Sequence, residues 1–223
     1  MSILREYIRE VMEILPKVQP ESQIFCDMDG VLVDFGSAVL TLVNSLLDGA
    51  PLEHAQITQN YRNRLQRLRD ELGADWRATA KADLDKKPVR NFMFGAIGAN
   101  PGPVYAAMPP HQDAIVKLWP FLNASGHRVN LLSAPIGTKN KNAMTSAEGK
   151  RIWAEQLEPA PAEIIITPAT QKVHYATSDG VPNILIDDRA STVDAWNAAG
   201  GIAILHIPGQ SGVTIRQLEE LGL

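Results

Sequence analysis

The chain is short of cysteine, of long apolar runs and of excess charge. Its 223 residues include one cysteine, Cys26, which excludes an internal disulfide and a multi-thiolate metal site. No apolar run approaches the roughly 18 residues that span a bilayer, and the first residues alternate charged and apolar positions, unlike a signal peptide. A net charge of -4 argues against binding of polymeric nucleic acid. We therefore expect a cytoplasmic protein with Cys26 buried in a strand and no membrane contact.

Short aliphatic runs alternate with helical patterns along the chain. Five runs predict strands, at residues 23–27, 128–133, 163–167, 183–187 and 202–206. Periodic apolar positions predict helices at 111–124, 146–157, 190–199 and 215–221. Strands that alternate with helices indicate a parallel sheet with right-handed crossovers. The sequence thus predicts an α/β fold, a Rossmann-like doubly wound parallel sheet.

One connection is too long for a simple crossover. About 100 residues separate the first two predicted strands, whereas a crossover needs only about a dozen. We interpret residues 36–108 as an inserted, mostly helical cap, and residues 1–35 and 109–223 as the core. Two helical patterns fill the first half of the insertion, at 37–47 and 60–72, and another precedes the first strand, at 3–15. The proline-rich stretch 88–110 is expected to be irregular.

Acidic residues follow two of the predicted strands. Asp27 and Asp29 come directly after the first strand, and Asp187 and Asp188 close the fourth. Open α/β sheets bind ligands beyond the carboxyl ends of their strands. Paired carboxylates there are costly unless a cation neutralises them. The pattern favours a site for a hard divalent cation over an ordinary acidic turn.

An acid, a hydroxyl, a lysine and an acid pair follow successive predicted strands. This order resembles the four motifs of the haloacid dehalogenase superfamily of phosphatases, which match as DMDGV at 27–31, LLS at 131–133, Lys172 and LIDD at 185–188. Within it the chain is most similar to the 5'(3')-deoxyribonucleotidase family, through DMDGVLVDF at 27–35, SAPI at 133–136, EGKRIWAEQL at 148–157 and LIDDR at 185–189. The resemblance covers residues 23–206 and is weakest in the cap.

The resemblance implies a role for each acid. Asp27 would be the nucleophile that forms an aspartyl-phosphate, and Asp29 would protonate the leaving group and then accept a proton from water. Mg²⁺ would be held by the Asp27 carboxylate, the Asp29 backbone carbonyl and Asp187. Asp188 would support the water shell of the metal and orient Lys172. Hydrolytic dehalogenases lack an acid two residues after the nucleophile, so Asp29 favours phosphoryl transfer.

The same resemblance implies that Ser133 and Lys172 bind the phosphoryl group. Two alternatives stay open at this point. Ser133 could simply cap the end of its strand, and Lys172 could be a solvated surface residue. Three other lysines compete with Lys172 for the phosphate: Lys139, Lys141 and Lys150.

Substrate choice must depend on the cap and its hinge. Of the aromatic residues there, Phe35 is the foremost candidate for stacking on a base, because it directly follows DMDGVLVD at the hinge. Asp34 is expected to cap or brace the first residues of the insertion and not to catalyse. We therefore expect a Mg²⁺-dependent phosphomonoesterase, a 5'-nucleotidase acting on (deoxy)nucleoside monophosphates, and leave a homodimer open. The alternatives are a phosphatase for sugar phosphates or other small metabolites, and a catalytically idle binding module.

Overall fold

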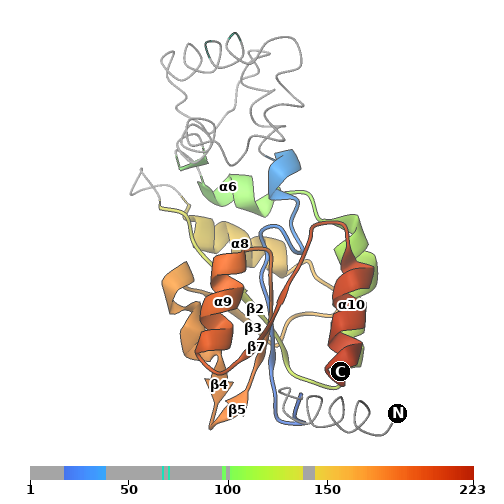
Figure 1. Ribbon diagram of the computed structural model, residues 1–223. Coiled ribbons are helices and arrows are strands. Elements are labelled where there is room, and N and C mark those ends of the chain that lie inside the picture. The colour runs from blue at the N-terminus through green and yellow to red at the C-terminus, as the bar shows by residue number, and fades with distance from the viewer. Residues whose placement is uncertain (1–17, 39–66, 68–69, 71–96, 99–100, 138–143) are drawn as a thin grey trace, which may run out of the picture.

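A five-stranded parallel sheet forms the centre of the computed structural model, which describes residues 18–38, 67, 70, 97–98, 101–137 and 144–223 (Figure 1). The strands lie in the order β3-β2-β1-β6-β7. Their bounds are Ile24–Cys26 for β1, Val129–Ser133 for β2, Glu163–Ile166 for β3, Ile184–Asp187 for β6 and Ile202–Leu205 for β7. Every pairing among them is parallel. Each strand lies within a run predicted from the sequence, so the predicted Rossmann-like fold is confirmed.

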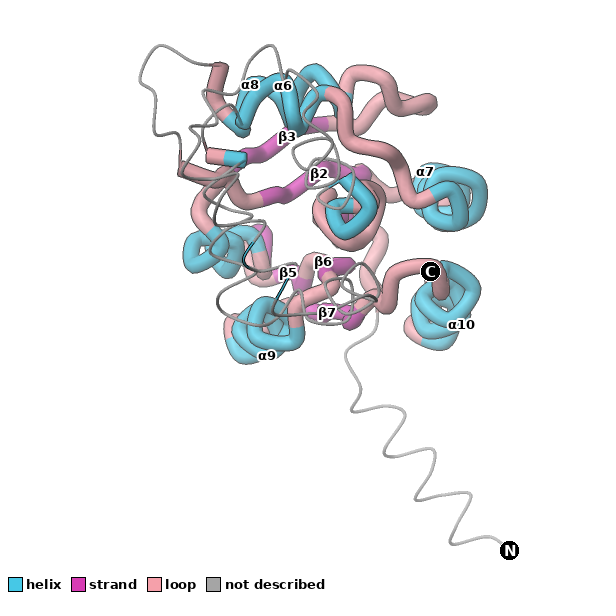
Figure 2. The backbone as a smooth tube through the Cα atoms, turned by 90° about the horizontal axis from the view of Figure 1, so that it is seen from above, coloured by secondary structure: helices cyan, strands magenta, loops and turns pink. Residues whose placement is uncertain are grey.

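Helices cover both faces of this sheet. On one face lie the π-helix η1 (Ala114–Leu118), which continues into α7 (Trp119–Ala124), together with α8 (Ser146–Ala154) and α10 (Ser211–Glu220). On the other lie the 3₁₀-helix η2 (Ala169–Tyr175) and α9 (Ala190–Ala198). Figure 2 shows α7 and α10 beside one face and α9 beside the other. The alternation of strand and helix in the sequence is thus realised as two helical layers.

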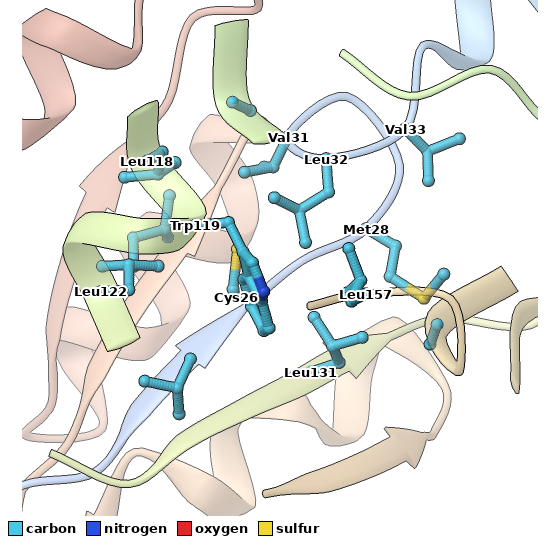
Figure 3. Packing of buried hydrophobic residues seen from close by; sticks show 14 of the residues in the cluster. Cys26, Met28, Val31, Leu32, Val33, Leu118, Trp119, Leu122, Leu131 and Leu157 are labelled. Carbon is cyan, nitrogen blue, oxygen red and sulfur yellow. The ribbon is translucent and has the colours of Figure 1, made fainter. Parts of the chain in front are cut away.

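The side chains of alternate strand residues pack into two different hydrophobic cores. Cys26 and Leu131 belong to the larger core, where Figure 3 shows them with Trp119 and other buried side chains. Phe25 points to the smaller core between β1, η2 and α9. Strands that are covered on both faces bury every residue, as all of β1 and β2 do here. The prediction that Cys26 is a buried strand residue is confirmed.

The expectation that residues 88–110 are irregular is wrong for one segment. Pro101–Ala106 form the helix α6, which packs closely on α8. Pro101 and Pro103 lie in its first turn, where a missing backbone N–H costs nothing because that group has no intrahelical partner. Proline therefore begins this helix instead of preventing it. Figure 1 shows α6 across the end of the sheet to which β1 points.

Several predicted elements lie outside the described residues. These are the helix at 3–15 and most of the insertion at 36–108, so the division into core and cap stays a prediction. The sequence did not predict the small antiparallel pair of β4 (Thr177–Ser178) and β5 (Val181–Pro182). In the described part of the chain, no helix is both long and apolar enough to cross a bilayer.

Candidate active site

The carboxyl ends of β1, β2 and β6 meet at one edge of the sheet. Cys26 pairs with Leu131 on one side and with Ile186 on the other, so these three strands end at nearly the same level. The Asp27 backbone N–H donates to the Ile186 carbonyl at 2.9 Å, which extends this pairing by one residue. The chain runs outward from β1 to β3 and then returns to β6, so the edge between β1 and β6 is a topological switch point. Ligands bind at such points in open α/β sheets.

Three carboxylates converge at this switch point. Oxygens of Asp27, Asp187 and Asp188 all lie within 4.8 Å of one another. Asp27 and Asp187 are 5% and 0% exposed, so water screens their repulsion poorly. Burial, followed by the negative charges of Asp27 and Asp187, raises the pKa of Asp188 to about 7. The sequence pattern predicted this meeting of two acid pairs, and the three carboxylates have the donor chemistry of a hard-cation site.

Lys172 lies between two of these acids. Its Nζ is 2.7 Å from Asp187 Oδ2 and 3.1 Å from Asp27 Oδ1, and its side chain is 2% exposed. Burial alone would lower the pKa of Lys172, but the charges of Asp27 and Asp187 outweigh it and raise the pKa. Lys172 is therefore an ammonium ion inside the site, which rules out a solvated surface position.

A second lysine, Lys150 of α8, holds the other part of the site. Its Nζ donates to Asp29 Oδ2 at 2.7 Å, to Ser133 Oγ at 2.8 Å and to the Ala134 carbonyl at 2.8 Å. The ring of Tyr105 lies beneath it, with its centroid 4.6 Å from Nζ. Sequence reasoning named Lys150 only as a competitor for phosphate, and among the aromatic residues it singled out Phe35 and not Tyr105.

Asp29 differs from the other acids in its surroundings. Its side chain is 29% exposed, against 6% for Asp27 and 0% for Asp187. Burial raises the pKa of the Asp29 carboxyl and the charge of Asp27 adds to this effect, while Lys150 opposes it. A carboxyl with a raised pKa in a partly exposed side chain has the properties of a general acid.

The charges of these side chains do not balance without a cation. Four carboxylates, those of Asp27, Asp29, Asp187 and Asp188, face the two ammonium groups of Lys150 and Lys172. Two negative charges therefore remain when all six groups are ionised, which a divalent cation would match. The residues present thus fit Mg²⁺, as the sequence predicted.

The segment after β1 is folded tightly over the site. The backbone N–H groups of Val31, Leu32 and Val33 all donate to the Met28 carbonyl, at 3.2, 2.9 and 2.8 Å. The Met28, Val31 and Leu32 side chains point into the larger core (Figure 3), which anchors the segment. Asp27 and Asp29 consequently leave the strand end in fixed directions.

Gly30→Ala should disrupt this segment. Gly30 has φ +78°, which non-glycine residues rarely adopt, and an added Cβ would overlap the Asp188 carboxylate. We expect at least about a tenfold loss of whatever activity the site performs, with a destabilisation of about 1–3 kcal/mol. Activity assays and urea unfolding measure the two effects. Gly180→Ala is the control, because Gly180 also has a positive φ but a Cβ there meets no other atom. Equal activity losses in both variants would contradict the Asp188 contact.

The two ends of the predicted insertion lie side by side next to the site. The Asp34 N–H donates to the Pro109 carbonyl and the His111 N–H to the Leu32 carbonyl, each at 2.8 Å. Asp34 Oδ1 accepts from the Ser37 N–H at 2.9 Å, so it caps the helical residues 35–38, as expected. Phe35 is half-buried, with its ring centroid 6.3 Å from that of Tyr105.

Comparisons with known proteins yield distant structural likenesses. No protein-family model and no curated protein matches the sequence. A HAD-superfamily hydrolase of subfamily IA from Geobacter sulfurreducens has a TM-score of 0.44 at 12% identity, covering 89% of this chain and 97% of its own. A phosphonoacetaldehyde hydrolase-like protein from Oleispira antarctica has a TM-score of 0.41 at 13% identity. The match covers 93% of this chain and 88% of that protein. A hydrolase from Streptococcus pneumoniae has a TM-score of 0.42 at 16% identity. The match covers 91% of this chain and 100% of that protein. These values are too low to carry an activity over to this chain.

Proposed function

We propose that this protein is a Mg²⁺-dependent phosphomonoesterase of the haloacid dehalogenase superfamily. The observation that carries the proposal is the convergence of two acid pairs, a hydroxyl and Lys172 at one switch point. Each group comes from a different part of the chain, and together they supply a nucleophile, an acid and cationic partners for an oxyanion. The order of these groups in the sequence, with its resemblance to the same superfamily, supports the proposal independently.

The reaction has two steps. Asp27 attacks phosphorus while the bond to the leaving oxygen breaks, and Asp29 gives its proton to that oxygen. Water then attacks the aspartyl-phosphate and gives a proton to Asp29, which releases inorganic phosphate and restores the Asp27 carboxylate. Asp29 is suited to both steps, because burial raises its pKa and its side chain is more exposed than those of Asp27 and Asp187, the two acids that pair with Lys172.

Lys172 and a bound Mg²⁺ would both stabilise the phosphoryl group. The Lys172 ammonium lies 3.1 Å from Asp27 Oδ1, so it also neutralises charge on the attacking group. Mg²⁺, held by the carboxylates of Asp27 and Asp187 and by the Asp29 backbone carbonyl, would offset the repulsion between Asp27 and a phosphate dianion. The Asp188 carboxylate, in the same cluster, would bind the water shell of the ion.

The direct test is hydrolysis of p-nitrophenyl phosphate by the purified chain, with and without Mg²⁺. We expect turnover that depends on the metal. A panel of phosphorylated metabolites then identifies the substrate class. Absence of turnover on every phosphate ester, by a folded protein with Mg²⁺ present, would favour the idle binding module instead.

For the substrate we propose a (deoxy)nucleoside 5'-monophosphate. Support comes from the family resemblance and from Phe35, a half-buried ring at the hinge whose centroid lies 6.3 Å from that of Tyr105. An aromatic face there would stack on a base, whereas a sugar phosphate offers it no such contact. The proposal fails if no nucleoside monophosphate is a better substrate than simple sugar phosphates of equal charge, and the general phosphatase then remains.

Phe35→Ala should lower kcat/KM for nucleoside monophosphates, by roughly 1–3 kcal/mol if the ring stacks on the base. The value for p-nitrophenyl phosphate should change much less, because the reacting groups are untouched. Phe121→Ala provides the control, since this ring also packs at the edge of the larger core but belongs to α7. An equal loss on both substrates would make Phe35 a packing residue of the hinge.

A further inference from the structure

We propose that Lys150 is a positioning residue that sets the orientation of Asp29 and Ser133 for leaving-group protonation, and that it does not bind phosphate itself. This inference rests on the proposed phosphomonoesterase function. It concerns a residue that the sequence named only as one of several possible phosphate ligands. Lys150 and Lys172 are both buried in the site, and their contacts assign them different tasks.

The ammonium of Lys150 has no N–H left for a substrate. A lysine offers three donors, and Nζ of Lys150 has three acceptors within 2.8 Å, namely Asp29 Oδ2, Ser133 Oγ and the Ala134 carbonyl. The ring of Tyr105 covers it further, and the side chain is 0% exposed. A phosphoryl oxygen could reach this ammonium only by displacing one of these partners. Lys150 must therefore act through the groups it holds.

Lys150 fixes which oxygen of Asp29 faces the reaction. Oδ2 accepts from Lys150, and the Tyr105 hydroxyl lies 3.5 Å from the same oxygen. Oδ1 is buried and has no hydrogen-bond partner among the residues that the structure describes. An unpaired buried carboxyl oxygen is costly, so its persistence next to a nucleophile suggests a partner supplied by the substrate. The leaving-group oxygen fits that position.

Lys150 also fixes the role of Ser133. The Ser133 Oγ accepts from Lys150 at 2.8 Å, which occupies a lone pair and leaves its hydrogen free to donate. Ser133 can then give that hydrogen to a phosphoryl oxygen, and it is not a simple strand cap. One ammonium thereby aligns a donor for the phosphoryl group with the acid for the leaving group.

The placement of Lys150 depends on the close contact of α8 with α6. Gly149 lies directly against the backbone of Gly102 in α6, and an added Cβ there would overlap the Gly102 carbonyl. Thr145 and Glu148 form a capping box that begins α8. Two contacts directly before Lys150 thus fix the position of the helix, as a positioning role requires.

The test compares two aryl phosphates of nearly equal shape. Phenyl phosphate has the poorer leaving group and needs protonation by Asp29, whereas p-nitrophenyl phosphate needs it much less. Lys150→Met, which keeps an unbranched buried side chain, should lower kcat/KM for phenyl phosphate about tenfold or more beyond its effect on p-nitrophenyl phosphate. Asp29→Asn should shift this ratio in the same direction. Lys172→Met is the matched lysine control and should slow both substrates about equally.

The outcomes are distinct for the two proposals. An equal loss on both substrates in a folded Lys150→Met protein, with Asp29→Asn still selective, would make Lys150 merely structural and would leave the phosphatase function intact. Failure of the wild type to cleave either ester would instead overturn the proposed function. Circular dichroism and thermal unfolding check the fold. If Lys150→Met does not fold, Lys150→Gln serves for the same comparison with the same expected shift.

Discussion

Asp27→Asn should remove turnover while leaving the fold unchanged. A carboxamide is a very poor nucleophile, so no aspartyl-phosphate forms, and we expect a loss of about 10³-fold or more in kcat. The substitution preserves shape, and the Asn Oδ1 can still accept the hydrogen bond that the Met28 N–H gives to Asp27 Oδ1 at 2.8 Å. It also removes one charge from a crowded set of acids, so stability should not fall.

A trapping measurement and a control variant make this prediction specific to a covalent mechanism. Acid quenching during turnover of radiolabelled substrate should trap a phosphoryl group on the wild type and none on Asp27→Asn. Asp113→Asn is the matched control, because Asp113 accepts from the Ser211 N–H at 2.8 Å at the start of α10 and is not one of the clustered acids. If a folded Asp27→Asn protein kept more than about a tenth of wild-type activity, a loss under roughly 1.4 kcal/mol, the covalent mechanism would be wrong.

The acid pairs could be predicted because their signals are local. Each pair directly follows a short aliphatic run, and parallel strands bring their carboxyl ends to one edge. The clustering of Asp27, Asp187 and Asp188 therefore follows from the strand order and does not depend on the path of the connecting loops. Lys172 was harder, since it lies on the 3₁₀-helix η2 and not at a strand end, and only its place in the ordered motifs identified it.

The buried role of Lys150 was missed, although its helix carries a usable signal. The buried positions of α8 follow helical spacing: Ser146, Gly149, Lys150, Trp153 and Ala154. A lysine in the middle of such a stripe, among small residues and a tryptophan, must be buried and therefore needs acceptors. The identity of those acceptors is not local, because Asp29 is 121 residues away in sequence.

Helix α10 shows the same limit in the fold. Apolar spacing predicts its start at residue 215, but the helix begins at Ser211. Ser211 and Thr214 are polar residues on the buried face, so the apolar pattern does not include them. The Ser211 N–H is bonded to Asp113, 98 residues earlier in the chain. A capping side chain that comes from another element cannot be recognised from the sequence around the helix itself.

Exhaustive chelation should abolish turnover, and added Mg²⁺ should restore it. When all four acids are ionised, their carboxylates against two ammonium groups leave the site with excess negative charge, which repels a phosphate dianion. Asp187 is fully buried and accepts from Lys172 and from the Arg189 N–H, so its carboxylate is held in one orientation. Such a fixed hard ligand at the switch point is what a small cation requires.

Variants of the acid pair at the end of β6 separate a ligand from a supporting residue. Asp187→Asn should raise the Mg²⁺ concentration for half-maximal rate by more than about a hundredfold, whereas Asp188→Asn, acting through the water shell, should raise it by about 10–100-fold. Asn at position 187 can still accept from the Arg189 N–H, so the fold should survive. Calorimetric titration with Mg²⁺ alone gives the affinities without any substrate. Equal shifts in both variants would make Asp188 a direct ligand, in keeping with its oxygen lying within 4.8 Å of the other two. Unchanged turnover after chelation would exclude the metal site altogether.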